Sequence, residues 1–90
     1  MIMNNPLRRK QIVKAYLEAL SMAGGYALED SRLMGFVNDL IRPEPTLGEH
    51  GVVKLFLRDN KFIRTAPDPL DPEMKQWVLT ELGRNHMASL

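Results

Sequence analysis

The chain has 90 residues, with 12 Lys and Arg against 11 Asp and Glu and a formal net charge of +1. This length predicts a single domain that spans residues 1–90. A content of 44% hydrophobic and 26% charged residues is typical of a globular chain. Because positive and negative charges nearly balance, the molecule as a whole is not attracted to a polyanion. Any nucleic-acid affinity must therefore come from local clusters of basic residues.

Cysteine is absent, which excludes a disulfide framework and thiolate metal sites and favours a reducing compartment, the cytoplasm. No stretch approaches the roughly 20 apolar residues that a membrane span needs. We therefore expect no membrane partner.

The first expected helix covers residues 6–23. Asn5 suits the N-cap and Pro6 the first helical position, while Gly24 and Gly25 favour a stop. Its apolar stripe consists of Ile12, Val13, Tyr16, Leu17 and Leu20. We expect residues 1–5 and 88–90 to be loose.

A short extended segment is expected at 26–28, followed by a second helix whose start Glu29, Asp30 and Ser31 can cap. This helix carries Leu33, Phe36, Val37, Leu40 and Ile41 at helical spacing. Its end is predicted at the sequence Arg42-Pro43-Glu44-Pro45, because proline removes a backbone donor and restricts the residue before it.

The third expected helix begins with a capping box formed by Thr46 and Glu49. Residues 59–61 close it, with Asn60 as the residue most tolerant of left-handed geometry. The crowded apolar set in 52–57 predicts one inward face, which leaves His50, Lys54 and Arg58 pointing elsewhere.

Residues 62–65 and 75–79 read as two strands, since both are rich in aromatic and β-branched residues. Three prolines in 66–74 predict a long, stiff hairpin loop between them. An alternative starts a helix at Asp71-Pro72 and continues it through Leu79. Thr80 can cap a last helix from Glu81 to about Ser89.

Two stretches resemble MarR- and PadR-type regulators. Leu57–Arg64 is similar to the stretch where their recognition helix ends and the first wing strand begins, and Trp77–Arg84 is similar to their second wing strand through its Leu-Thr-x-x-Gly motif. The order of elements is also that of a winged helix. The resemblance implies an α+β fold: a three-helix helix-turn-helix core, a two-stranded β-hairpin wing and a short C-terminal helix. It further implies a small DNA-binding regulator of transcription, or of a mobile element or phage, in a bacterial or phage setting.

The resemblance places the third helix in the major groove of double-stranded DNA. The chain departs from the family at the proline-rich turn before this helix and at Gly48 and Gly51, which leave few side chains for reading bases. The candidate contacts are Thr46, His50, Lys54, Arg58, Lys61, Arg64 and Lys75. A second basic patch on the first helix comprises Arg8, Arg9, Lys10 and Lys14.

An acidic hairpin tip supports a different hypothesis, a protein-interaction adaptor whose contacts are Asp68, Leu70, Asp71 and Glu73. Carboxylates there would repel phosphates and attract a basic partner. The chain lacks the long helices through which many such regulators dimerise, so the oligomeric state, including a homodimer, stays open.

Catalytic, metal and cofactor patterns are missing from the sequence. His50 and His86 lie in different segments, and Ser21 lacks the glycines of a nucleophile elbow. Glu49 and His50 are adjacent and so lie on different faces of a helix. We therefore predict no enzyme activity and no cofactor.

Overall fold

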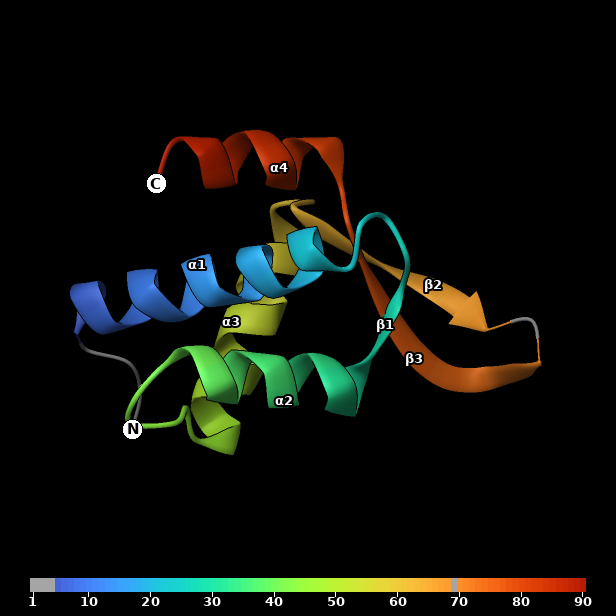
Figure 1. The fold of residues 1–90 in the computed structure, drawn as a ribbon, viewed down its shortest axis with the longest axis horizontal. Helices are drawn as coiled ribbons and strands as arrows, with labels where there is room; N and C mark the ends of the chain where they lie inside the picture. Colours follow the sequence, from blue (N-terminus) through green and yellow to red (C-terminus); the bar gives the residue numbers. More distant parts are fainter. Residues whose placement is uncertain (1–4, 69) are drawn as a thin grey trace.

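The computed structural model describes residues 5–68 and 70–90. Its elements follow the expected order: α1 (Pro6–Met22), β1 (Leu28–Glu29), α2 (Asp30–Leu40), α3 (Leu47–Asp59), β2 (Ile63–Asp68), β3 (Asp71–Leu79) and α4 (Glu81–Ala88). The strands form an antiparallel sheet in the order β1-β3-β2. The β2–β3 hairpin projects from one end of the helices, and α4 returns beside α1 (Figure 1).

Local capping explains three of the four helix starts. The Asn5 side chain accepts hydrogen bonds from two amides of α1, both halves of the Thr46–Glu49 capping box are present, and Thr80 caps α4. No side-chain capping bond is made at Glu29, so the capping expected for α2 at residues 29–31 is not how that helix begins.

The hairpin is longer than the sequence predicted. β2 and β3 continue to Asp68 and Asp71, so neither the long loop over 66–74 nor the alternative helix at Asp71-Pro72 is correct. β2 is an edge strand, where proline is tolerated because one side of the strand has no ladder partner. The pairing between β2 and β3 also shifts in register between Pro67 and Asp68, which is an irregularity of the ladder next to the proline.

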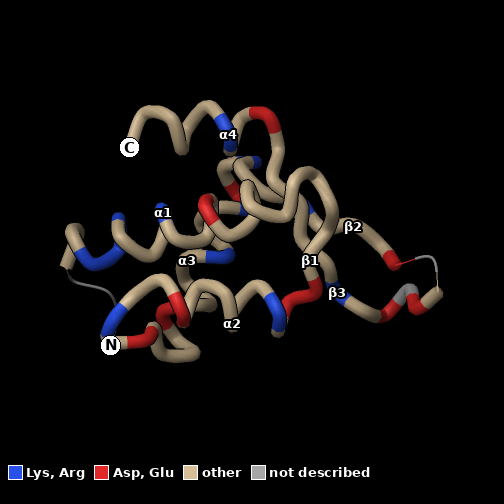
Figure 2. Tube along the Cα trace, in the orientation of Figure 1, with Lys and Arg blue, Asp and Glu red and all other residues tan. Residues whose placement is uncertain are grey.

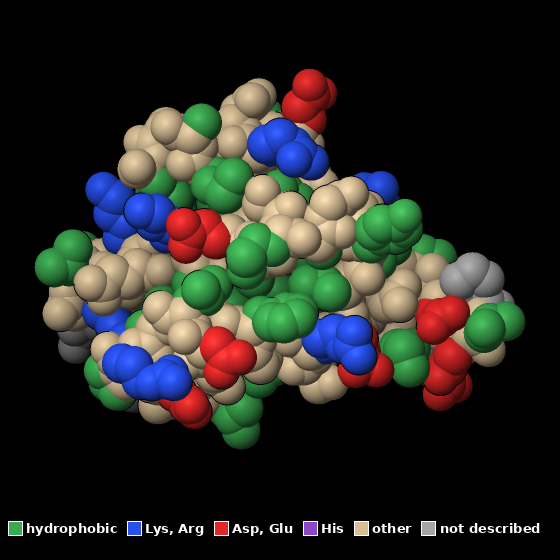
Figure 3. All heavy atoms as spheres, in the orientation of Figure 1, with side chains coloured by type: hydrophobic (Ala, Val, Ile, Leu, Met, Phe, Trp, Pro, Cys, Tyr) green, Lys and Arg blue, Asp and Glu red, His purple; other side chains and the backbone are tan. Residues whose placement is uncertain are grey.

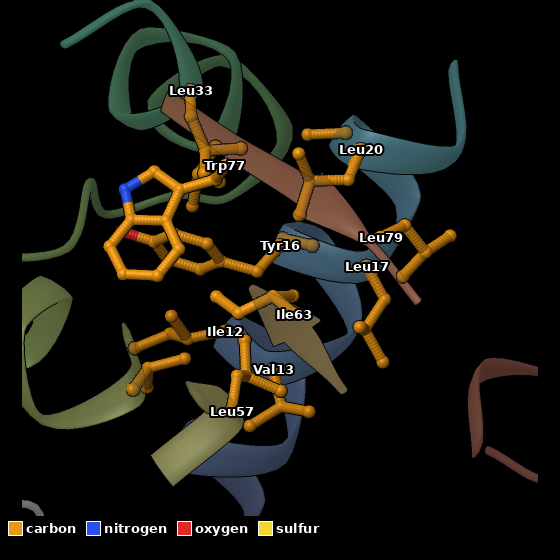
Figure 4. Close-up of a cluster of buried hydrophobic side chains, with 14 of the residues drawn as sticks. Ile12, Val13, Tyr16, Leu17, Leu20, Leu33, Leu57, Ile63, Trp77 and Leu79 are labelled. Atoms are coloured by element: carbon orange, nitrogen blue, oxygen red, sulfur yellow. The ribbon is translucent and has the colours of Figure 1, made fainter. Parts of the chain in front are cut away.

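The core gathers around α1. Tyr16 and Trp77 belong to it together with side chains from α1, α2, α3 and the hairpin (Figure 4). The fully buried large side chains include Ile12, Tyr16, Leu17, Leu20, Leu33, Leu57 and Ile63. α1 therefore supplies the scaffold against which α3 is oriented.

The Leu-Thr-x-x-Gly stretch joins the hairpin to α4 and also holds the turn that follows α3. The Thr80 hydroxyl donates to the carbonyl oxygens of Lys61 (2.6 Å) and Phe62 (3.0 Å) and accepts from the Gly83 amide (3.0 Å). A Cβ on Gly83 would lie 2.1 Å from the Phe62 carbonyl oxygen. The Leu-Thr-x-x-Gly motif therefore has a structural cause: the Thr80 hydroxyl bonds the turn after α3, and Gly83 allows the Phe62 backbone to approach closely.

At the C-terminus α4 ends at Ala88, and Leu90 packs against the core. Asn5 caps α1, while residues 1–4 lie outside the described part. No helix among the described residues is long and apolar enough to cross a bilayer.

Candidate nucleic-acid interface

His50 faces the interior, contrary to its expected role in DNA contact. It is 2% exposed, and its ring nitrogens bond the Tyr16 hydroxyl and, at 2.9 Å, the Asn38 side-chain oxygen. Burial, together with nearby Lys54, lowers the pKa of His50, so the ring is neutral near pH 7. His50 links α3 to α1 and α2 and cannot reach a ligand.

Lys54 also points inward, which corrects its assignment to the DNA surface. Its ammonium lies 2.9 Å from the Asp30 carboxylate, and its side chain is 18% exposed. The Trp77 indole donates to the same carboxylate oxygen at 2.7 Å. Burial alone would raise the pKa of Asp30, but the hydrogen bonds from Lys54 and Trp77 outweigh it and hold this pKa below its ordinary value.

The first part of α3 presents apolar side chains to solvent. Leu47, Val52 and Leu55 are exposed there, with Leu47 at 79% and Leu55 at 51%. A Cβ on Gly51 would meet nothing within 4 Å. Proteins distinguish base pairs largely through side chains that hydrogen-bond to base edges. Leu47, Val52 and Leu55 cannot make such bonds.

The start of α3 is tied to α1. The Thr46 hydroxyl accepts from the Glu49 amide, so it is engaged in capping although Thr46 itself is exposed. Arg8 donates to both Glu49 carboxylate oxygens, at 3.2 and 3.3 Å, and to the Pro43 carbonyl. The bond from Arg8, with that from the Thr46 amide, lowers the pKa of Glu49. Arg8 is thus a structural residue, which removes it from the predicted second basic patch.

The other residues of that patch remain accessible. Arg9, Lys10 and Lys14 are exposed along α1, and the Arg9 guanidinium lies 4.8 Å from the centre of the Phe56 ring. They project from α1 and not from α3 or the hairpin.

The end of α3 differs from its start. Arg58 and Lys61 are exposed, and Arg58 pairs only with its exposed neighbour Asp59 at 3.3 Å within the described residues. The Phe62 amide donates to the Leu57 carbonyl and the Lys61 amide to the Arg58 carbonyl. These two bonds make a Schellman motif in which Lys61, at φ +63°, occupies the left-handed position. The expectation that Asn60 would take this conformation is wrong.

Arg64 and Lys75 lie on opposite faces of the hairpin. Thr65 pairs with Trp77, so Arg64 projects away from the Trp77 face, whereas Lys75 lies on it with its ammonium 5.8 Å from the Trp77 ring centre. Both are exposed. The predicted contacts consequently do not form one continuous basic face, and Lys and Arg are spread over several elements (Figure 2).

The hairpin tip gathers the acidic residues predicted for it. Leu70 is 94% exposed, and Asp68, Asp71 and Glu73 lie close to it in the sequence. Figure 2 shows acidic residues gathered at the end of the hairpin. The Asp68 carboxylate accepts from the Leu70 amide and that of Asp71 from the Glu73 amide, so two of the carboxylates also shape the turn.

Sequence patterns did not predict two hydrogen-bonded groups, Tyr16–His50–Asn38 and Lys54–Asp30–Trp77. One signal was available, since His50, Val53, Lys54 and Leu57 share the i, i+3, i+4, i+7 spacing of a single helix face. A pattern built from apolar residues alone leaves out His50 and Lys54, so it does not reveal this buried face.

No family model matches the chain, and no curated protein matches it. Among solved structures it is similar to the putative transcriptional regulator TA0346 from Thermoplasma acidophilum, with a TM-score of 0.73 over 97% of this chain and 81% of that chain. The chain has a winged-helix fold. At 9% identity the likeness shows the fold alone. The β2–β3 hairpin is the wing, and α3 occupies the place of the recognition helix.

Proposed function

We propose that this winged-helix protein binds double-stranded DNA through the phosphate backbone, with little base reading. The contacts are the wing-root cations, defined as Arg58, Lys61 and Arg64. The observation that carries the proposal is that all three are exposed within seven consecutive residues, at the junction of α3 and the wing. Cations that meet phosphates release counterions and supply sequence-independent affinity.

The backbone at Lys61 supports this function. Left-handed geometry costs a residue with a Cβ roughly 1 kcal/mol, and glycine is the usual occupant of this position. No acceptor for the Lys61 ammonium is found in the described part of the chain. A cation kept on a strained backbone without an internal role fits a contact with an external anion.

Binding to a labelled generic duplex at several salt concentrations tests the proposal. Replacing all three wing-root cations by Gln should weaken binding about tenfold or more and reduce the salt slope by about 0.9 for each phosphate that is no longer neutralised. The matched control is Lys14→Gln, Arg32→Gln, Arg84→Gln, which removes the same charge from exposed positions elsewhere. Equal weakening by both triple variants would leave only a net-charge effect and contradict the proposal.

A second candidate function, a protein-interaction adaptor, is favoured by the apolar outward side of α3. A partner that covers Leu47, Val52 and Leu55 would bury surface that water now meets. The acidic wing tip would then serve a basic region of the same partner.

Leu55→Lys separates the two functions. If α3 approaches DNA, the added cation should strengthen duplex binding and steepen its salt dependence. If α3 docks on protein, DNA binding should be absent in the parent chain and in the variant.

A further inference from the structure

The wing tip, defined as Asp68, Leu70, Asp71 and Glu73, combines an unburied apolar side chain with negative charge. Leu70 is 94% exposed, so its side chain contacts almost nothing in its own chain. Asp71 and Glu73 are exposed, and neither forms a salt bridge with the residues that the structure describes. The Asp68 carboxylate accepts from the Leu70 amide at 2.8 Å, which holds Leu70 in a defined turn.

A pocket of about 360 Å³ between α1 and α4 has the complementary character. Val13, Phe56 and Leu90 provide its apolar wall. Arg9 and Lys10 also line it, and no Asp or Glu does so among the described residues. Both cations are exposed, and neither forms a salt bridge within the described part of the chain. An apolar side chain surrounded by carboxylates therefore matches this pocket in both polarity and charge.

The wing tip and the pocket lie at opposite ends of the molecule. The pocket is built on the first half of α1, whereas the hairpin projects beyond the other end of the helices (Figure 1). Figure 3 shows Lys and Arg side chains over the first half of α1 and Asp and Glu side chains at the end of the hairpin. A wing tip consequently cannot reach the pocket of its own chain. Two copies that lie side by side, related by a two-fold axis, can each place a wing tip at the other's pocket.

We propose that two copies of this chain form a reciprocal dimer, in which the wing tip of each copy binds the α1–α4 pocket of the other. Leu70 contacts the apolar wall, and the carboxylates of Asp71 and Glu73 lie beside the charged groups of Arg9 and Lys10. The two contacts are identical by symmetry, so the assembly closes at two copies.

The dimer uses none of the wing-root cations, so this inference does not rest on DNA binding. Each contact is small, and two small contacts predict a weak, reversible dimer with a dissociation constant on the order of 10–100 µM. Because the charged groups at the pocket are exposed, added salt should weaken the dimer further.

Sedimentation equilibrium of the whole chain, at concentrations that bracket this dissociation constant, tests the assembly. The average mass should rise from one copy to two as the concentration increases, and no larger species should form. A chain that stays monomeric throughout, or that continues to associate beyond two copies, would overturn the reciprocal dimer.

Leu70→Ser tests the apolar anchor. Because Leu70 is exposed in a single copy, its loss should leave the unfolding transition unchanged while it weakens dimerisation about tenfold or more. The matched control is Leu47→Ser, which alters a 79% exposed leucine on α3 and should dimerise as the parent does. Equal weakening by the two variants would contradict an interface at the wing tip.

Charge exchange identifies the two surfaces that meet. Arg9→Glu with Lys10→Glu reverses the pocket, and acidic residues near a helix start keep α1 stable. Asp71→Lys with Glu73→Lys reverses the wing tip. Each double variant alone should dimerise about tenfold or more weakly than the parent, because like charges then meet at both contacts. Circular dichroism establishes that each is folded.

Mixing the two double variants should restore association, because each wing tip then meets a pocket of opposite charge. The measurement is fluorescence anisotropy of the labelled pocket variant, titrated with the wing-tip variant. Glu18→Lys with Asp39→Lys is the matched control, since it adds the same charge at exposed positions outside the wing tip. The control should bind the pocket variant about tenfold more weakly than the wing-tip variant does. Equal binding by the two, or no binding by either, would overturn the proposal.

Discussion

The two ends of α3 use their polar residues in opposite ways. In the first part, His50 and Lys54 turn inward to α1 and α2, and Leu47 and Leu55 face solvent. At the other end, Arg58 and Lys61 face solvent beside a strained turn. A recognition-helix position therefore does not by itself make a polar side chain a DNA contact. The rotation of the helix about its axis, which its packing decides, selects which residues are available.

The largest expected effect comes from disrupting the backbone contact that supports the turn after α3, beside the exposed Arg58 and Lys61. Gly83→Ala places a Cβ against the Phe62 carbonyl, and we expect a loss of roughly 3 kcal/mol or more in unfolding free energy, because backbone must move to accept it. Gly51→Ala is the control on α3, where a Cβ meets nothing within 4 Å. It should raise stability by about 0.5–1 kcal/mol. Chemical denaturation measures both; similar losses for the two would contradict the close approach at Gly83.

A smaller effect contrasts the inward lysine with the outward arginine. Lys54→Gln should cost about 1–2 kcal/mol, since it leaves a half-buried Asp30 carboxylate with one partner fewer. Arg58→Gln removes an exposed pair and should change stability by less than about 0.5 kcal/mol. On duplex DNA the ranking should reverse, with Arg58→Gln the more damaging variant. Comparable stability losses would mean that Lys54 is not buried as described.

Lowering the pH should reduce the stability that buried His50 contributes in the first part of α3. The folded-state pKa of His50 lies below its unfolded value, so the unfolded chain takes up the proton first as pH falls. Stability contributed by the neutral ring is present above the unfolded pKa of about 6.5 and declines as pH drops below it. Urea unfolding at pH 7.5 and 5.5 should show this loss. His50→Gln should be less stable at pH 7.5 and should show a smaller decline; an unchanged decline would assign it to other groups.

The smallest expected effect concerns the strained lysine. Lys61→Gly should stabilise the fold by about 0.5–1 kcal/mol, because glycine adopts the left-handed position freely. The same variant should weaken DNA binding and lower the salt slope by about 0.9. Thermal unfolding and duplex titration measure the two effects. A more stable variant with undiminished DNA affinity would remove Lys61 from the interface.

Several elements were predictable because their causes are local. The Asn5 cap, the Thr46–Glu49 capping box and the Thr80 cap depend on residues two or three positions apart. The resemblance in Trp77–Arg84 was informative for a similar reason, since Thr80 and Gly83 make contacts that few other residues allow.

The wing illustrates the limit of local rules. Prolines predicted a loop over 66–74, yet β2 runs to Asp68 and β3 begins at Asp71. Proline is tolerated because β2 is a sheet edge and because β1 pairs with β3 only at Gln76 and Trp77, which leaves the outer part of β3 with one neighbour. Whether a strand lies at an edge depends on the order β1-β3-β2, which no short stretch of sequence encodes.

By itself the sequence determined the order of helices and strands, the helix caps and the stripe of α1 that forms the core, since all of these follow from spacing along one chain. Tertiary structure decided which side of α3 meets solvent. Asp30, Tyr16 and Asn38 come from other segments, and they provide His50 and Lys54 with hydrogen-bond partners. A polar side chain is stable in the interior when such partners are present, and their positions are set only when the helices pack.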